Sequence, residues 1–192
     1  MDEGWAGLMG AVLGGAISQA ATWGVELRRE SRIARNFAVA ASSELAASIG
    51  MVKVRNWRDA FVSAANNAYA GNVYSISVHT KDDYLPMCRA AMAHAGSIDH
   101  DLAILLGRIL TLTDSLIADI KRISSYTVDT PESLLSTEDP EGAARVYNTL
   151  VNLLDAAIIT GDQAIQRVDL IYPRPARGLV TRMRAAWRAF KS

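Results

Sequence analysis

The residue types best suited to binding a metal ion occur together at one point of the chain. His94 and His100 flank a Gly-Ser pair, and Asp99 and Asp101 lie beside the second histidine. Zinc sites usually carry their ligands at fixed spacings, such as His-Glu-x-x-His on a helix or pairs of cysteines. The sequence contains neither arrangement. We therefore interpret His100 as a surface residue near a helix N-terminus, and we expect no metal and no cofactor.

The single cysteine, Cys88, is the residue that nucleophilic catalysis would use. A reactive thiolate needs a neighbouring histidine and an electropositive setting, whereas Cys88 lies near Met87 and Met92 in a predicted short helix. We interpret it as a small core residue. No glycine-rich phosphate loop follows a strand, and the Glu and His pairs of hydrolytic helical bundles are missing. The sequence thus indicates that the protein is not an enzyme, and a hydrolase with an unrecognised site is the least favoured alternative.

Two sets of carboxylates remain. Asp155, Asp162 and Asp169 repeat every seven residues and form the polar face of a predicted helix, which requires no function. Glu44 conflicts with its setting, because it falls on an otherwise apolar helical stripe. A buried carboxylate needs a partner. Glu44 is therefore predicted either to pair inside the bundle with an arginine or a hydroxyl, or to lie where the stripe is loose and reach water.

The elements that position these residues begin with an uncharged segment. No residue from Gly4 to Val25 is charged, and about 22 residues at 1.5 Å per residue span the ~30 Å hydrocarbon core of a bilayer. Trp5 and Trp23 lie near the two ends, where indole rings favour the headgroup interfaces. We predict a transmembrane anchor over residues 1–27. The basic cluster that follows it consists of Arg28, Arg29, Arg32 and Arg35.

The position of this basic cluster sets the expected orientation. A cleaved signal peptide would begin with basic residues, whereas this chain begins Asp2-Glu3 and places them after the apolar segment. By the positive-inside rule, the N-terminus lies outside the inner (cell) membrane and the rest of the chain lies in the cytoplasm. The alternative is that residues 4–25 form a buried, Ala- and Gly-rich helix of a soluble bundle.

Small residues recur at four-residue spacing within the predicted anchor. Such a face lets a second helix approach closely, and in lipid this close packing drives helix association. We therefore predict a homo-oligomer. The predicted association face consists of Gly7, Gly10, Ala11, Gly14, Gly15 and Ser18. The alternative is that glycine and alanine are simply common in helices of this kind.

Residues 28–172 are predicted to form a cytoplasmic helical bundle, so the fold class is all-α. Spacings of three and four predict one long helix from the membrane to about Tyr69, bent near Gly50. Its expected apolar stripe consists of Ile33, Phe37, Ala40, Ala41, Leu45, Ser48 and Val52. Residues 73–78 alternate and are predicted to be a loop with an extended segment.

The remainder of the bundle is predicted from apolar periodicity and capping residues. A short helix is expected over residues 84–95, and longer helices over residues 97–125 and 140–171. Their apolar faces are broad enough to form a core. Three long helices joined by turns predict an antiparallel bundle with additional short helices.

Residues 173–192 form a basic, amphipathic C-terminal segment after Pro173 and Pro175. A basic face opposite an apolar face with aromatic residues is typical of a helix that lies in the headgroup plane and binds anionic lipid. The residues expected at the membrane interface are Arg182, Arg184, Trp187, Arg188, Phe190 and Lys191. The alternatives are a final helix of the bundle, a nucleic-acid-binding tail and a target helix for a partner protein.

Charge is segregated along the chain. Residues 59–170 carry fifteen acidic and seven basic residues, whereas both flanks are basic. The acidic middle argues against nucleic acid as a partner and offers a docking surface that faces away from anionic lipid. We predict a non-catalytic, single-pass membrane scaffold that self-associates and docks an unidentified protein. The alternative is a membrane-perturbing, pore-forming effector, holin-like or toxin-like. This order of parts is similar to that of small bacterial or phage-borne membrane proteins, which implies no activity.

Overall fold

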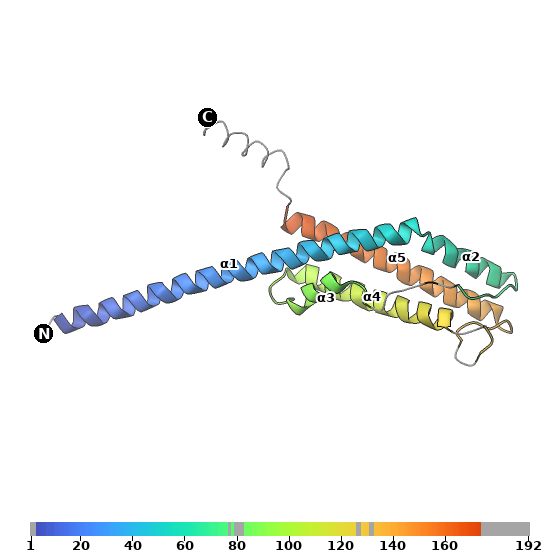
Figure 1. The fold of residues 1–192 in the computed structure, drawn as a ribbon, viewed down its shortest axis with the longest axis horizontal. Coiled ribbons are helices and arrows are strands. Elements are labelled where there is room, and N and C mark those ends of the chain that lie inside the picture. Colours follow the sequence, from blue (N-terminus) through green and yellow to red (C-terminus); the bar gives the residue numbers. More distant parts are fainter. Residues whose placement is uncertain (1–2, 77, 79–82, 126–127, 131–132, 174–192) are drawn as a thin grey trace, which may run out of the picture.

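The structure is a computed structural model that describes residues 3–76, 78, 83–125, 128–130 and 133–173, with backbone only for residues 3–18, 20 and 21. The described part of the chain is all-helical and holds no strand. Figure 1 shows its five helices, which are α1 (Glu3–Val54), α2 (Trp57–Tyr69), α3 (Pro86–Ala93), α4 (His100–Ser125) and α5 (Pro140–Ile171). The predicted fold class is therefore confirmed as helical.

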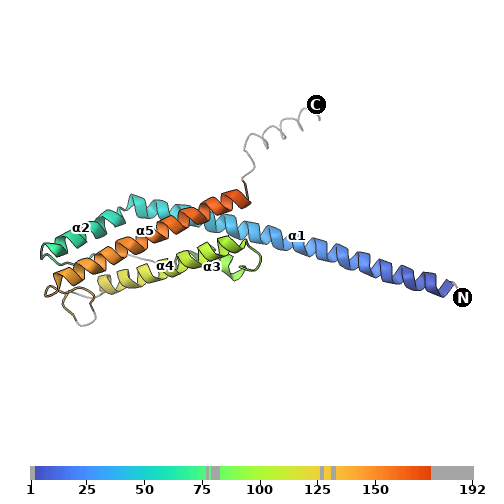
Figure 2. The ribbon, with the colours of Figure 1, turned by 180° about the vertical axis from the view of Figure 1, so that it is seen from behind.

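Helix α5 lies at the centre of the bundle. It contacts α1, α2 and α4, whereas α3 bridges α1 and α4 at one end. Helices α1 and α2 follow one another along one side of α5, and α4 lies along the other side (Figures 1 and 2). Helix α5 runs antiparallel to both, whereas α1 and α4 run in the same direction. The bundle is thus antiparallel only in part.

Two groups of buried side chains hold the helices together. One joins α2, α4 and α5 around Phe61 and Tyr147, and the other joins α1, α3, α4 and α5 around Leu45 and Leu102. Burial of these apolar groups is the main favourable contribution to folding. The Tyr147 hydroxyl donates a hydrogen bond to the carbonyl oxygen of Tyr74, which fixes this part of the connection between α2 and α3 against α5.

The predicted continuous helix to Tyr69 is wrong. Helix α1 ends at Val54, and α2 begins at Trp57. Between them Asn56 has φ 51° and ψ 38°, in the left-handed region. Asparagine enters this region more readily than most residues. Gly50, where a bend was expected, lies within α1.

The buried face of α1 also differs from the predicted stripe. Ala41 and Leu45 are buried as expected, but Ile33 is exposed and Ala40 is only half-buried. The face that packs on α3 and α5 instead consists of Ala34, Ala38, Ala41, Ser42, Leu45 and Ile49. The small side chains of this face allow the helices to approach closely. The predicted stripe relied on large apolar residues, and it therefore did not include most of these small ones.

The later helices agree closely with the predicted ranges. Asp139 caps α5 by accepting a hydrogen bond from the Gly142 N–H at 2.8 Å, with Pro140 at the first helical position. Asp99 caps α4 in the same way through the Leu102 N–H at 3.0 Å. The described part of the 73–78 segment forms no strand. Its Ile76 carbonyl instead accepts a hydrogen bond from the Ser124 hydroxyl of α4 at 3.2 Å.

Candidate functional site

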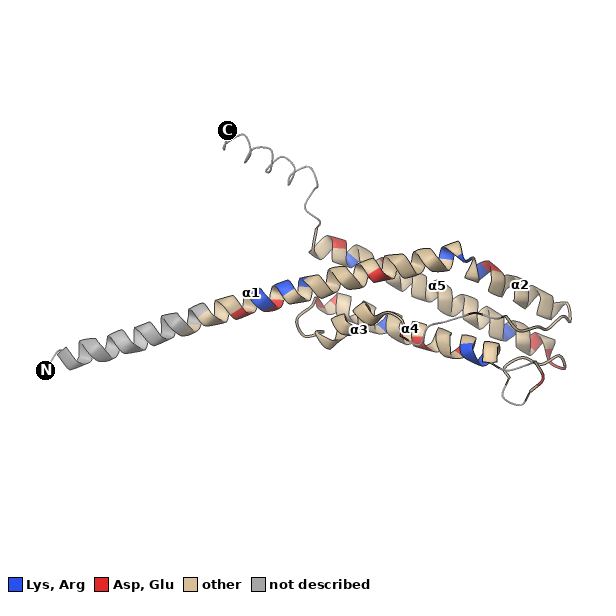
Figure 3. Cartoon of the chain, viewed as in Figure 1, with Lys and Arg blue, Asp and Glu red and all other residues tan. Residues whose placement is uncertain are grey.

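The N-terminal part of α1 projects beyond the bundle (Figures 1 and 3). Among the residues of α1 with described side chains, Ala34 is the first that is buried, and residues 22–33 are all exposed. Trp23, Val25 and Leu27 are 69%, 67% and 65% exposed. A lone helix with large apolar side chains in water is only marginally stable, because most helical stability comes from packing of an apolar face. Exposed apolar residues of this kind are typical of a surface that lipid or another protein covers.

Helix α1 is long and apolar enough to cross a membrane. By length and composition alone, the part that meets this criterion among residues with described side chains is Thr22–Val54. The core helix of a soluble protein can meet the same criterion, and much of this stretch packs in the bundle through Ala34, Ala38 and Leu45. The predicted anchor from Gly4 to Val25 lies mostly on residues of which only the helical backbone is described.

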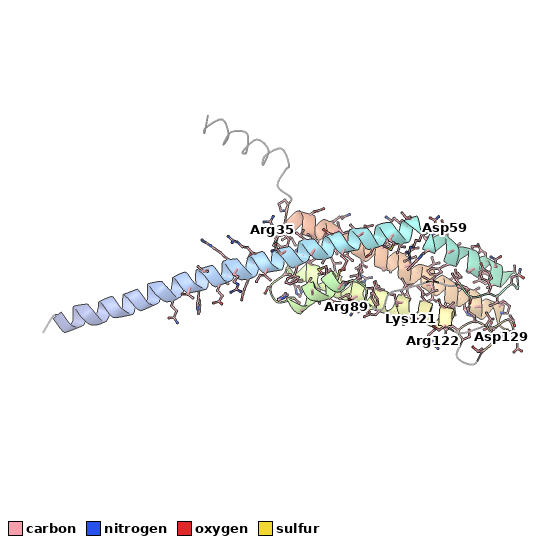
Figure 4. All side chains as sticks on the ribbon, in the orientation of Figure 1. Arg35, Asp59, Arg89, Lys121, Arg122 and Asp129 are labelled. Carbon is pink, nitrogen blue, oxygen red and sulfur yellow. The ribbon has the colours of Figure 1, made fainter. Side chains whose placement is uncertain are left out.

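Four arginines lie on one side of α1 where it leaves the bundle. Arg28, Arg29, Arg32 and Arg35 are all exposed, and Arg35 lies on α1 where the helix meets the bundle (Figure 4). Glu26 and Glu30 lie in the same segment and reduce its net charge. The segment nevertheless keeps four cations within about two turns, next to the exposed apolar residues.

The end of α5 lies at the same end of the bundle. Val168, in the last turn of α5, belongs to the same buried group as Ala34, the first buried residue of α1. Figures 1 and 2 both show α5 ending beside α1 where α1 leaves the bundle. The described chain stops at Pro173. Pro173 therefore lies at the end of the bundle from which α1 projects.

The remaining predicted interface and association residues cannot be placed by their side chains. Gly7 to Ser18 and Trp5 lie in the helical backbone of α1, where four-residue spacing keeps small residues on one face. Arg182 to Lys191 lie outside the described residues.

Asp99 and Asp101, two of the four residues considered as metal ligands, both contact an arginine. The Arg167 guanidinium donates two hydrogen bonds to the Asp99 carboxylate, each 2.8 Å long, and lies 3.0 Å from Asp101. These hydrogen bonds hold the pKa of Asp99 below its usual range. His94 instead stacks on Phe37, with ring centroids 4.6 Å apart. Among the described residues, no three His, Cys, Asp or Glu side chains gather as metal ligands would.

Glu44 is half-buried, and its partner is a backbone group. The Cys88 N–H donates to Oε2 of Glu44 at 2.9 Å. The first N–H groups of a helix lack partners within the helix, and Leu85, the residue before α3, makes no side-chain cap. Glu44 of α1 therefore caps α3. The arginine or hydroxyl partner expected from the sequence is not the one found.

The Cys88 side chain is fully buried below this cap. Burial, and after it the charge of Glu44, raises the pKa of the thiol. Its Sγ lies 3.9 Å from the carbonyl oxygen of Ala41. The thiol is thus protonated and enclosed at neutral pH, as a core residue would be and a nucleophile would not.

A crevice of about 860 Å³, which the sequence did not indicate, lies between α1 and α4. Its floor is formed by α5, through Leu154, Ala157 and Ile158, and residues 83–86 border it. Most of the lining is apolar, with Glu44, Asp83 and Arg55 as its charged members. No periodicity could reveal a space that depends on how three separate helices pack.

No protein-family model matches the chain, and neither a curated protein nor a solved structure matches it. The described part of the chain contains a projecting helix with exposed apolar residues, four exposed arginines on one side of that helix and a crevice of small-molecule size between α1 and α4. These features suit attachment and binding.

Proposed function

We propose that the chain is a non-catalytic scaffold anchored in the inner membrane by the N-terminal part of α1. The observation that carries this proposal is the continuity of α1. One unbroken helix leads from the exposed apolar turn at Trp23, past the arginines, into the buried face that begins at Ala34. In this orientation the N-terminus lies outside, and the arginines meet anionic headgroups on the cytoplasmic side.

The position of the chain's end supports a second attachment to the same leaflet. Because α5 ends beside the exit of α1, the basic C-terminal segment starts close to the membrane. A helix with a basic face and an aromatic apolar face would then lie in the headgroup plane. Two attachments would hold the bundle upright on the membrane.

The opposite end of the bundle supports docking of a partner protein with a basic surface. Glu138, Asp139 and Glu141 are exposed near the start of α5, far from the projecting part of α1 (Figure 3). Arg145 lies 3.6 Å from Asp139 and 3.8 Å from Glu141, which leaves an excess of negative charge among these four residues. A surface with such an excess is repelled by anionic lipid and attracts cationic partners. In a homo-oligomer formed through the glycine face, several such surfaces would face the cytoplasm together.

Extraction of membranes with carbonate tests the anchor. We expect the full chain to resist extraction and a chain lacking residues 1–27 to be released. Leu13→Arg should also be released, because an arginine at the centre of a span costs about 2.5–3.5 kcal/mol on insertion scales. Met51→Arg is the matched control, since Met51 is exposed on the bundle, and it should remain bound. Release of the full chain would overturn the proposal.

The mass of the protein in detergent tests self-association. Gly10→Leu with Gly14→Leu should lower the oligomer mass, because leucine prevents close approach of the helix backbones. A membrane-potential dye separates the scaffold from the pore-forming alternative. Rapid depolarisation on overproduction, lost when residues 4–25 are deleted, would replace the scaffold by the effector.

A further inference from the structure

The crevice is narrow and closed at one level by two isoleucines. A Cβ atom placed on Gly161 of α5 would lie 2.9 Å from Cδ1 of Ile49 and 3.0 Å from Cδ1 of Ile109. These two side chains, from α1 and α4, therefore meet above Gly161. From this level the crevice continues along α5 over Ala157 and Leu154. It is a slot between α1 and α4.

Residues 83–86 bridge the two sides of the slot. Tyr84 donates a hydrogen bond to Asp114 of α4, and Arg89 of α3 forms an ion pair with the same carboxylate at 2.7 Å. On the other side, Cys88 is bonded to Glu44 of α1. The border of the slot is thus fixed to both helices. Its shape is a property of the folded bundle.

The burial of the floor determines what could enter. Leu154, Leu116 and Ile109 lie at the base of the slot and are only 2%, 4% and 3% exposed, so its open part lies above them, beside more exposed residues such as Met51 and Thr113. A docked helix is about 10–12 Å wide with its side chains and would need a broad, exposed floor. A volume of about 860 Å³ lies within the ~300–1,000 Å³ of small-molecule sites. The slot therefore fits a slender apolar group.

The charges give the slot a direction. Asp83 belongs to the bridge of residues 83–86 and Glu44 lies at the same end of the slot, whereas Arg55 directly follows the last residue of α1, about three turns beyond Glu44 and roughly 16 Å away at 1.5 Å per residue. Arg55 is exposed, and the described residues include no ion-pair partner for it. Trp57 lines the slot beside Arg55. An anionic group would be attracted to Arg55 and repelled from the other end.

We propose that this slot binds a single-chain anionic amphiphile of the fatty-acid class. The alkyl chain lies over α5 between α1 and α4, and the carboxylate lies at Arg55. This inference goes beyond the scaffold function and does not depend on it, because the slot is formed by the bundle alone. The matching features are the apolar lining, the buried floor and the single cation at one end.

Photolabelling of the full chain in lipid nanodiscs tests the proposal. The probe is palmitic acid that carries a diazirine near the end of its alkyl chain, and mass spectrometry locates the label. We expect labelled peptides from α4 and α5 that contain Leu116 and Leu154. Label confined to the N-terminal part of α1 would show lipid contact only and would overturn the site. Loss of label as oligomerisation increases would assign the slot to a second copy.

Two variants with matched controls make the result specific. Ala157→Phe fills the slot and should abolish labelling of α4 and α5, whereas Ile159→Phe, on the exposed side of the same helix, should not. Circular dichroism verifies that both variants fold. Labelling that persists in Ala157→Phe would contradict the proposal.

The second variant tests the charge at Arg55. Arg55→Glu should weaken labelling by the fatty acid about threefold to fivefold, the scale of an exposed ion pair. Labelling by a diazirine alcohol of equal length should not change. Lys53→Glu, exposed on α1 and outside the slot, should affect neither probe. Equal loss with both probes in Arg55→Glu would exclude recognition of the carboxylate.

Discussion

Oε2 of Glu44 lies 2.9 Å from the backbone nitrogen of Cys88, and this hydrogen bond joins positions 44 residues apart in the sequence. It supplies α3 with the cap that its own flanking residues do not provide. It also explains how a carboxylate is accommodated on the apolar side of α1. The same contact fixes α3 against α1 and, through residues 83–86, sets the border of the crevice.

Replacement of Glu44 by leucine should destabilise the bundle. Loss of an N-terminal cap typically costs about 1 kcal/mol, which corresponds to a fall in Tm of roughly 2–4 °C for a chain of this size. Glu44→Gln keeps an acceptor oxygen and should lose less. Thermal melts followed by circular dichroism measure both, and an unchanged Tm in Glu44→Leu would show that the cap contributes nothing.

The Cys88 thiol should be unreactive in the folded protein. Burial raises its pKa, and the negative charge of Glu44 raises it further. Reaction with iodoacetamide at pH 8 should therefore be at least about 100-fold slower than in urea, because modification then requires unfolding of the region. Cys88 is the single cysteine of the chain, so the rate needs no correction for other thiols. A rate near that in urea would place the thiol at the surface.

The contact between Asp99 and Arg167 should make stability depend on pH under acidic conditions. Its hydrogen bonds lower the pKa of Asp99 in the folded state. The stabilisation is therefore complete above the pKa of Asp99 in the unfolded chain, and it is lost as the pH falls through the lower, folded value. Tm should differ between the wild type and Asp99→Asn at pH 7, and the two should converge at low pH.

The matched variant for this contact is Asp162→Asn. Asp162 is exposed on α5, and its replacement should leave the acid profile unchanged. A constant difference between wild type and Asp99→Asn at every pH would mean that the ionised carboxylate is not what Arg167 stabilises.

Ser42→Ala should stabilise the protein slightly. Ser42 is 3% exposed, and its Oγ has no hydrogen-bond partner among the described residues. A buried polar group without a partner costs about 1–3 kcal/mol, and alanine has the higher helix propensity. We expect Tm to rise by a few degrees. Thr160→Val is the contrast, because the Thr160 hydroxyl donates to the Ala156 carbonyl at 2.7 Å, and it should not raise Tm.

Helices α4 and α5 could be predicted from the sequence because their faces consist of large apolar residues. Leu102, Leu106, Leu116 and Ile120 recur at helical spacing, and all four are buried. Such a pattern determines which face of the helix packs against the core. The cap at Asp139 was equally visible, since an aspartate before proline is a strong helix start.

Helix α1 was harder to interpret because its contacts use small residues. Ala34 and Ala38 bury little area, yet they allow close approach to α3 and α5. The break at Asn56 involves neither proline nor glycine, so the local sequence did not indicate it. The partner of Glu44 and the crevice depend on segments far apart in the chain. The arginine cluster could be predicted because charge next to an apolar segment is a local pattern.

Because α1 is one helix from Glu3 to Val54, its two ends can rotate about the helix axis only together. A turn of about 100°, one residue's worth of helical rotation, would carry Ala34 and Ala38 away from α3 and α5. No flexible joint separates the projecting part of α1 from the part in the bundle, so a rotation of the projecting part is transmitted to the bundle. The first break in the described helical chain is at Asn56, beyond Glu44 and beside the crevice. A rotation of α1 should therefore change the width of that opening.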